Sequence, residues 1–287
     1  MKYIIPFILL FSLYTQHAFA EAEKSTPFVI SGVVSDSSGS ASIKQFVRYL
    51  RNKTNINFEI YYASNYSKLS RVLRDNPHAF GWTCGAPYVE DEKQDQQQLV
   101  SVPLFKGQPL YHSLIITAIK NSEKKLLDFK GKIFVYSDPR SNSGYLAPSV
   151  QLLEQGVEIN QHFSLMINSG SHKNSIVSLL NGLADVAAID EYIWIEYIKE
   201  HPDTLSELHE IERTGPYPFI PVVAGKDVAQ TRIRKVREVL INMSNDRQGK
   251  LILKNIGMDG FVNKTTSFYQ PVRDMINMVD KNTDSQR

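Results

Sequence analysis

The chain has 287 residues, of which 32 are basic and 30 acidic, and it contains a single cysteine, Cys84. This near-balance of charge gives no support for nucleic-acid binding through a basic face. One thiol cannot form a disulfide within the chain, so the fold must depend on an ordinary hydrophobic core.

Residues 1–20 have the pattern of a secretory signal peptide. Lys2 precedes an apolar run from Tyr3 to Tyr14, and the small residues Ala18 and Ala20 predict cleavage after Ala20. The apolar run is too short to span a bilayer comfortably. We therefore expect an exported, soluble protein in the periplasm.

The mature chain, with roughly 265 residues, is longer than a usual single-core domain. In its first part, apolar runs predict strands at 28–34, 57–63, 79–84 and 112–119. Helical spacing of apolar residues predicts helices at 42–54 and 65–76. This βαβ alternation is typical of a mostly parallel sheet with helices on both faces.

The alternation starts again after the lysine-rich stretch 120–132. Strands are predicted at 132–137, 163–168 and 184–190, and helices at 143–156, 172–182, 227–244 and 246–257. Prolines within 216–221 suit a stiff segment that crosses between two lobes.

The sequence thus predicts an α/β fold of two lobes, each a mostly parallel sheet flanked by helices. Its parts are a signal peptide (1–20), lobe 1 (27–117 plus 222–280), lobe 2 (120–216) and a frayed polar tail (281–287). Crossings near Ala118–Ile119 and Pro218–Pro221 would join the lobes. The cleft between such lobes is the natural ligand site.

A polar loop, "SDPRSNSGY", follows the strand predicted at 132–137 and places Ser141, Asn142 and Ser143 at a helix start. Amide hydrogens in the first turn of a helix lack internal partners, and the helix dipole adds partial positive charge there. These residues can therefore form a socket for an oxyanion. The alternative is that Ser141 or Ser143 only caps the helix.

A second loop, "NSGSHKNSI", has the same character after the next predicted strand. It offers Ser169, Ser171 and His172 at another helix start, at the same end of the same sheet. A histidine there can donate a hydrogen bond to an anion. The alternative is a capping or surface histidine.

Other chemistries find little support in the sequence. It contains no HExxH, CxxC, GxSxG or GxxxxGK[ST] motif, so we expect no metal site, no cofactor and no enzymatic activity. Cys84 has no evident histidine partner and is predicted to be a buried structural thiol.

The segments "DPRSNSGYLAP" and "SGSHKNSIVSLLNGLADVAAID", with "GWTCGAPYVE" before them and "PFIPVVAG" after them, resemble a known family. This is the phosphonate-binding family of periplasmic solute-binding proteins, which have the type II fold and serve ABC importers for phosphonate, phosphite and phosphate. The resemblance covers about residues 28–255.

The resemblance implies that Ser141, Asn142, Ser143 and His172 hold the ligand oxygens, with Asn142 where the family usually has threonine. It implies that Tyr88 is a cleft tyrosine of lobe 1, although a core tyrosine is the alternative. Asp190 would receive a ligand ammonium group or would only cap a helix. The loop Ser35–Ser40 is a weaker candidate.

We therefore expect a monomeric periplasmic protein that captures a small oxyanion for the membrane permease of an ABC importer. The alternative is a periplasmic sensor that passes the same closure to a membrane kinase or receptor. Closure itself is common to both functions.

Overall fold

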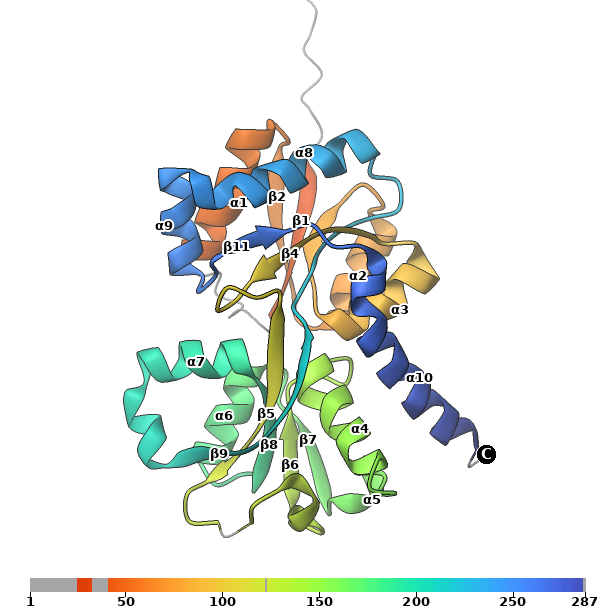
Figure 1. The fold of residues 1–287 in the computed structure, drawn as a ribbon, viewed down its shortest axis with the longest axis vertical. Helices are drawn as coiled ribbons and strands as arrows, with labels where there is room; N and C mark the ends of the chain where they lie inside the picture. Colours follow the sequence, from red (N-terminus) through yellow and green to blue (C-terminus); the bar gives the residue numbers. More distant parts are fainter. Residues whose placement is uncertain (1–24, 33–40, 122, 286–287) are drawn as a thin grey trace, which may run out of the picture.

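The computed structural model describes residues 25–32, 41–121 and 123–285. The signal peptide expected at 1–20 and the loop Ser35–Ser40 lie outside these residues. Figure 1 shows two lobes, one above the other, joined by two long strands.

The upper lobe contains a six-stranded sheet in the order β11-β4-β10-β3-β1-β2. β1 pairs in parallel with β2 and β3, whereas β10 is antiparallel to β3 and β4, and β11 is antiparallel to β4. The strands are β1 (Thr26–Ser31), β2 (Phe58–Ala63), β3 (Phe80–Trp82), β4 (Gln98–Leu104), β10 (Val222–Ala224) and β11 (Gly260–Val262).

The lower lobe contains a five-stranded sheet in the order β7-β6-β8-β5-β9. Its strands are β5 (Leu110–Ala118), β6 (Ile133–Tyr136), β7 (Leu165–Asn168), β8 (Val186–Asp190) and β9 (Leu208–Pro218). β6 is parallel to β7 and β8, but β5 is antiparallel to both β8 and β9. The α/β fold is as expected, but both sheets are mixed and not mostly parallel, because β10 and β11 in the upper sheet and β5 in the lower sheet run against their neighbours.

β5 also corrects the expected lobe boundary. The strand expected at 112–119 forms, but it pairs with β8 and β9 in the lower sheet and so is not part of lobe 1. The first crossing therefore lies between β4 and β5 and not near Ala118–Ile119. The second lies between β9 and β10, at the expected prolines.

The helices pack on the faces of the two sheets, each through an apolar stripe. In α1, for example, Ile43, Phe46, Val47 and Leu50 recur at helical spacing and are buried. The upper helices are α1 (Ala41–Thr54), α2 (Tyr66–Asp75), α3 (Gly85–Asp95), α8 (Gln230–Ile241) and α9 (Arg247–Asn255). The lower helices are α4 (Ala147–Leu153), α5 (Ile159–His162), α6 (His172–Leu180) and α7 (Glu191–Glu200).

Short helical turns complete these elements. A π-helical turn, Asn142–Leu146, runs directly into α4, so the chain is helical from Asn142 to Leu153. The 3₁₀ turns are Leu126–Phe129, Pro202–Ser206, Asn242–Asn245 and Thr266–Tyr269. Within the residues that the structure describes, no helix is long and apolar enough to cross a membrane.

The last helix, α10 (Gln270–Ser285), corrects the expectation of a frayed tail from residue 281. It leaves the upper lobe and runs down beside the lower one (Figure 1), in contact with both α3 and α4. Val272 and Met275 are buried in the upper core, and Asn282 donates a hydrogen bond to Glu158 of the lower lobe. This packing on both lobes explains why the chain stays helical as far as Ser285, while residues 286–287 of the expected tail lie outside the described residues.

Candidate functional site

Three parallel strands of the lower sheet end at one edge and bring the predicted residues together. The loop after β6 carries Ser141, the helix after β7 begins at His172, and β8 ends at Asp190. His172 Nε2 lies 3.2 Å from Ser137 Oγ and 3.5 Å from Ser141 Oγ. We call Ser137, Ser141, Asn142, Ser143 and His172 the serine–histidine cluster, and all five are buried.

Ser141 is the N-cap of the helical run from Asn142, since its Oγ accepts a hydrogen bond from Gly144 N at 3.0 Å. The capping alternative is thus confirmed for Ser141, but the same hydroxyl can still donate its own hydrogen. Ser143 does not cap. Its carbonyl accepts from Ser113 Oγ at 2.7 Å, and its own hydroxyl is buried without a hydrogen bond of normal geometry.

The backbone selects the tautomer of His172. Its Nδ1 accepts a hydrogen bond from Asp190 N at 3.3 Å, so the ring hydrogen is on Nε2, which faces Ser137 and Ser141. Burial lowers the pKa of His172 to about 3. The imidazole is therefore a neutral donor at any physiological pH.

Asp190 lies next to this cluster and caps α7. Its Oδ1 accepts from Tyr192 N at 2.8 Å and from Ile193 N at 3.4 Å, as the capping alternative predicts. Burial raises the pKa of Asp190 to about 7, against the lowering effect of these two backbone hydrogen bonds. The carboxyl group therefore titrates near neutral pH.

Asn142 connects the cluster to the upper lobe and to the first crossing strand. Its backbone N donates to Cys84 Sγ at 3.4 Å, and its Nδ2 donates to the Tyr111 hydroxyl of β5 at 3.0 Å. Rotating the amide by 180° would let the Tyr111 hydroxyl donate to Oδ1 and turn Nδ2 toward a ligand. Asn142 can thus supply a donor where a threonine would supply a hydroxyl.

Cys84 is buried, as predicted, and its sulfur packs against Tyr66. Burial raises the pKa of the Cys84 thiol to about 11, so it stays protonated and unreactive. Cys84 and His172 belong to different lobes. Cys84 accepts a hydrogen bond from the backbone of Asn142, and His172 accepts one from the backbone of Asp190. The thiol is part of the wall of the site.

Several buried polar atoms around this cluster have no hydrogen bond of normal geometry among the described residues. They include Ser143 Oγ, Asn142 Oδ1, Thr83 Oγ1 and the Tyr66 hydroxyl. An unsatisfied buried polar group costs about 1–3 kcal/mol, so such groups are rare unless they serve a ligand or water. They come from both lobes, which is the arrangement of an interlobe site.

The structure does not bring Tyr88 into this cluster. Its ring packs edge-on against Tyr269, with centroids 4.9 Å apart, and its pKa is raised chiefly by burial and then by the charge of Glu92. Its hydroxyl, too, lacks a hydrogen-bond partner among the described residues. The position fits the core alternative, while Tyr66 takes the place facing Cys84.

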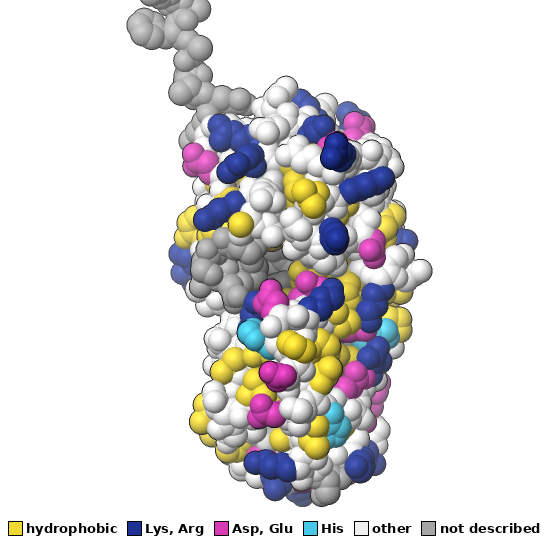
Figure 2. All heavy atoms as spheres, turned by 90° about the vertical axis from the view of Figure 1, so that its left-hand side faces the viewer, with side chains coloured by type: hydrophobic (Ala, Val, Ile, Leu, Met, Phe, Trp, Pro, Cys, Tyr) yellow, Lys and Arg dark blue, Asp and Glu magenta, His cyan; other side chains and the backbone are white. Residues whose placement is uncertain are grey.

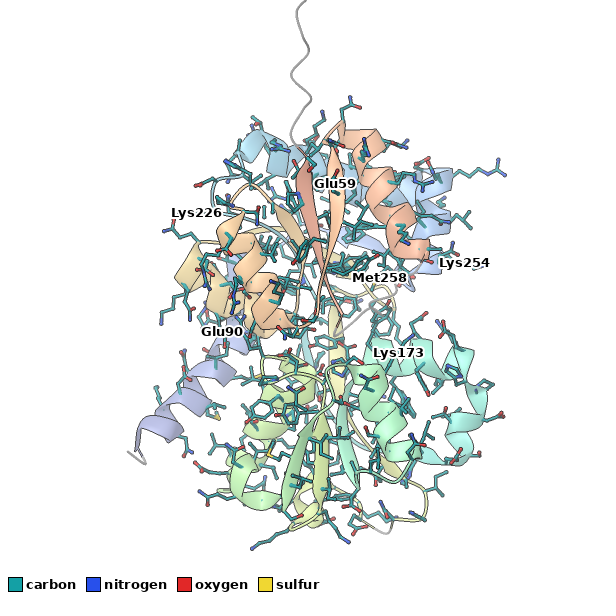
Figure 3. The ribbon with its side chains drawn as sticks, turned by 180° about the vertical axis from the view of Figure 1, so that it is seen from behind. Glu59, Glu90, Lys173, Lys226, Lys254 and Met258 are labelled. Atoms are coloured by element: carbon teal, nitrogen blue, oxygen red, sulfur yellow. The ribbon has the colours of Figure 1, made fainter. Side chains whose placement is uncertain are left out.

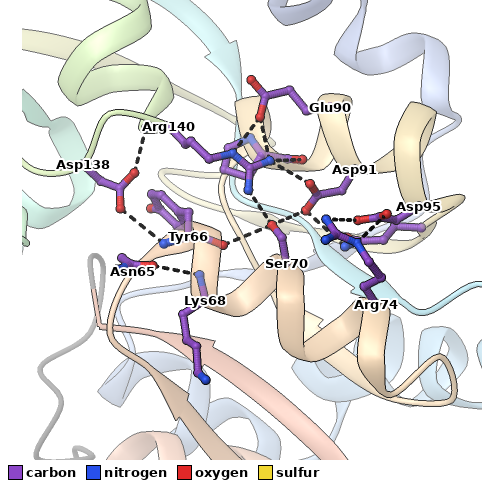
Figure 4. Close-up of polar contacts among 12 residues, drawn as sticks. Asn65, Tyr66, Lys68, Ser70, Arg74, Glu90, Asp91, Asp95, Asp138 and Arg140 are labelled. Atoms are coloured by element: carbon purple, nitrogen blue, oxygen red, sulfur yellow. Dashed lines mark hydrogen bonds and ion pairs between the residues drawn. The ribbon is translucent and has the colours of Figure 1, made fainter.

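Arg140, directly before Ser141, links the two lobes (Figure 4). Its guanidinium donates to Glu90 Oε2 at 2.7 Å, to Asp91 Oδ1 at 2.7 Å and to Ser70 Oγ at 2.6 Å. These three partners belong to α2 and α3 of the upper lobe. We call this set the interlobe arginine network.

Asp138, two residues earlier, adds a second polar link. Its Oδ2 accepts from Tyr66 N at 3.2 Å, and its Oδ1 accepts from Arg140 N at 2.7 Å. The loop that carries the serines is therefore held against the upper lobe on both sides of Pro139.

Sequence reasoning missed Tyr66, Tyr111 and Arg140. Arg140 stands within the loop that was singled out, so its charge beside three neutral donors was a usable signal. Tyr66 follows the N-cap Asn65 at the start of α2, and Tyr111 is the second residue of β5, so each lies at a loop–element junction. Nothing local in the sequence indicates that these junctions face the serines.

Comparison with known proteins identifies the family. A family model described as "ABC transporter, phosphonate, periplasmic substrate-binding protein" matches residues 28–269. The phosphonates-binding periplasmic protein of Escherichia coli (strain K12) is 23% identical over 279 residues, covering 94% of this chain and 82% of that protein.

Solved structures show the same two-lobed fold. PhnD1 from Prochlorococcus marinus in complex with methylphosphonate superposes with a TM-score of 0.81 at 19% identity, covering 90% of this chain and 99% of that one. A binding protein component of an ABC phosphonate transporter from Pseudomonas aeruginosa also gives 0.81 at 19% identity, covering 88% and 85%.

These matches confirm the expected family and favour the importer component over the sensor. The family model spans nearly all of both lobes, including the serine–histidine cluster. This chain belongs to the phosphonate-binding family of periplasmic substrate-binding proteins of ABC transporters.

Proposed function

We propose that this protein binds a phosphorus oxyanion, of phosphonate, phosphite or phosphate type, at the serine–histidine cluster and delivers it to the permease of an ABC importer. The observation that carries this proposal is the convergence of Ser141, Ser143 and the neutral His172 at one buried sheet edge. Ser143 Oγ and the Tyr66 hydroxyl add donors from opposite lobes that make no hydrogen bond of normal geometry.

Neutral donors suit a doubly charged oxyanion in a dry site. A hydrogen bond to a charged group is worth about 1.5–3 kcal/mol, so a few of them outweigh the cost of removing the anion from water. Burial also raises the pKa of the hydroxyls of Tyr66 and Tyr111 well above the ordinary value, which keeps both protonated as donors.

Asp190 is the proposed contact for a ligand ammonium group. Its backbone N–H donates to His172 Nδ1, and its carboxyl is ionised mainly above about pH 7, so the charge of the site toward such a ligand changes near neutrality. A zwitterionic aminoalkyl phosphonate would favour the ionised carboxylate by charge attraction.

The setting of this function is also part of the proposal. The relatives are periplasmic proteins, which supports export with cleavage after Ala20. We propose that the mature protein acts as a monomer and that the closed, ligand-bound form is what the permease recognises. Mass determination of the exported protein tests the cleavage after Ala20, and light scattering tests the monomeric state.

Isothermal titration calorimetry against phosphate, phosphite, methylphosphonate and 2-aminoethylphosphonate tests the proposal. At least one of them should bind tightly. The double variant Ser143→Ala with His172→Ala should weaken that binding at least about tenfold while leaving the protein folded.

A matched control replaces the same residue types outside the site, Ser178→Ala with His201→Ala. The Ser178 hydroxyl donates to Asn174 O within α6, and His201 is the C-cap residue that follows α7, so this control should keep wild-type affinity. Wild-type affinity in the Ser143 and His172 variant would refute the site assignment.

A further inference from the structure

Basic residues are concentrated in three helices of the upper lobe, α1, α8 and α9. Among the described residues of these helices Glu238 is the single acid, although acids and bases are nearly equal in number in the whole chain. The basic residues are Lys44, Arg48, Arg51 and Lys53 in α1, Arg232, Arg234, Lys235 and Arg237 in α8, and Arg247, Lys250 and Lys254 in α9. The near-balance of charge in the sequence therefore conceals an uneven distribution in space.

The three helices present these charges on one side of the upper lobe. α1 packs against both α8 and α9, and each helix turns its apolar stripe inward, so the charged sides point outward. Figure 2 shows dark blue Lys and Arg side chains over much of the upper lobe on this side. Figure 3 shows Lys254 at the outer edge of the upper lobe, on the same side as Met258 and Lys173 at the lobe junction.

Most of these charges have no partner within the described protein. Lys53 Nζ lies 3.3 Å from Asp246 Oδ2. Arg232 donates to Thr26 Oγ1, and Arg237 donates to backbone carbonyl groups. The other basic residues of the three helices are exposed and form no ion pair with any residue that the structure describes, and we call them the basic face. They are Lys44, Arg48, Arg51, Arg234, Lys235, Arg247, Lys250 and Lys254.

The composition of the basic face favours a lipid surface over a protein partner. The core of a protein interface is apolar and rich in aromatic residues. In the described parts of α1, α8 and α9, Leu251 is the one large apolar side chain that is exposed, at 59%. Separate cations around a single leucine suit a layer of anionic headgroups, where each Lys or Arg adds attraction without a matching contact.

We propose that the basic face binds the anionic phospholipid surface of a membrane. The family to which the chain belongs is periplasmic, and a periplasmic protein meets such a surface at the membrane that contains an ABC permease. Binding would be peripheral and sensitive to salt, since Leu251 alone buries too little apolar area for stable insertion. The proposal does not depend on the oxyanion site. It would keep the protein near its permease, with the upper lobe toward the bilayer.

Sedimentation with vesicles tests this proposal on the exported protein. The wild type should sediment with vesicles of equal parts phosphatidylglycerol and phosphatidylcholine at low salt, and should stay in solution with pure phosphatidylcholine. Raising the ionic strength from about 20 mM to about 500 mM should release it, because the screening length becomes shorter. Equal binding to the two kinds of vesicle, or binding to neither, overturns the proposal.

A charge-neutralising variant identifies the surface. It combines Lys44→Gln, Arg48→Gln, Lys250→Gln and Lys254→Gln. Its partitioning onto phosphatidylglycerol vesicles should fall at least about tenfold. The matched control removes the same charges at exposed positions outside the basic face, with Arg71→Gln, Lys120→Gln, Lys130→Gln and Lys226→Gln. The control should partition as the wild type does. Equal losses in the two variants would mean that net charge alone attracts the membrane, which refutes the proposed face.

Poly-L-glutamate separates a lipid surface from an acidic polypeptide. Salt-sensitive binding of the wild type to poly-L-glutamate, without binding to phosphatidylglycerol vesicles, would assign the basic face to an acidic protein partner and overturn the lipid proposal. Thermal unfolding and oxyanion calorimetry should be unchanged in the basic-face variant, because the serine–histidine cluster lies on neither α1 nor α9. Loss of membrane binding and loss of oxyanion binding are therefore measured independently.

Discussion

At the residue scale, Asp190 and His172 show how burial sets two neighbouring charges in opposite directions. The imidazole loses its proton because desolvation disfavours the cation, and the carboxyl keeps its proton because desolvation disfavours the anion. Both groups are then neutral at mildly acidic pH. An oxyanion thus meets no negative charge from Asp190 below about pH 7.

The raised pKa of Asp190 predicts a pH dependence of stability. The folded-state pKa of Asp190 lies near 7 and the ordinary value is 3.8, so between these values the unfolded chain releases a proton that the folded one retains. The contribution of Asp190 to stability should therefore fall as pH rises across this window, by about 1–4 kcal/mol. Asp190→Asn keeps the helix cap and removes the titration, so this fall should shrink.

Urea unfolding of the wild type and the variant at about pH 5 and about pH 8 measures this difference. If stability changes by the same amount in both proteins between the two pH values, the titration does not belong to Asp190. His172 acts in the opposite direction: its pKa is lowered from 6.5 to about 3, so below about pH 6.5 the unfolded chain binds a proton that the folded chain does not. Because both proteins contain His172, the difference between them isolates Asp190.

At the element scale, the start of the helix at Asn142 is packed too closely for a larger residue. A Cβ added at Gly144 would lie 3.0 Å from Ser141 Oγ and 3.2 Å from His172 Cε1, and would clash with Ser137 Oγ. The glycine allows the serines and the histidine to approach one another. A methyl group at this position must push them apart.

We expect Gly144→Ala to weaken oxyanion binding at least about tenfold, with a smaller effect on stability. Calorimetry and thermal unfolding of the variant separate the two effects. Gly85→Ala is the matched control: it also lies at a helix start near the lobe junction, but its added Cβ would meet only ordinary contacts at 3.6 Å. Equal losses of affinity in the two variants would contradict the proposed role of Gly144.

Local patterns predicted most of the elements, because helical and alternating spacings are properties of short segments. The helices at α1, α2, α6 and α9 and the strands β6 to β8 were expected where they form. Strand pairing is not local, so the sequence did not indicate that β5 joins the lower sheet. The polar end of α10 was misjudged because its partners, α3 and α4, are distant in sequence.

The site residues show the same difference between local patterns and contacts that join distant segments. Ser141, Asn142, Ser143 and His172 were predicted because each lies in a polar loop directly after an apolar strand. Tyr88 was selected by resemblance, and the structure packs it against Tyr269. Tyr66 faces the site from the other lobe, and no pattern within a single segment reports a contact across lobes.

At the scale of the whole molecule, the interlobe arginine network joins the two lobes next to the site. Arg140 is part of the serine loop, while Glu90, Asp91 and Ser70 belong to α2 and α3. Because Asp91 is buried, its carboxylate needs this partner when the lobes are together. Closure of the two lobes and binding of the ligand at the serine loop should therefore be coupled.

Arg140→Met should accordingly lower ligand affinity at least about fivefold by reducing the population of the closed form. Calorimetry reports the affinity, and small-angle scattering reports closure in the presence of ligand. Arg74→Met is the matched control, since Arg74 pairs with Asp95 between the same two helices but within one lobe. An effect of equal size in both variants would show general destabilisation instead of a link to closure.

A second variant separates closure from the cost of a buried unpaired charge. Arg140→Met with Asp91→Asn should recover thermal stability relative to Arg140→Met alone, because no carboxylate is left unpaired at position 91. Its affinity should stay low. Recovery of affinity together with stability would mean that Arg140 acts only on folding.

The position of α10 also bears on how solute reaches the interior. The helix touches both α3 and α4, on the side opposite α7 and α9 in Figure 1, so it adds a third tie to the two crossing strands. Because α10 holds the two lobes together on one side, the lobes should separate most readily on the opposite side. Solute should therefore enter and leave past α7 and α9, and a disulfide engineered across that flank should trap bound solute, whereas one beside α10 should leave its exchange almost unchanged.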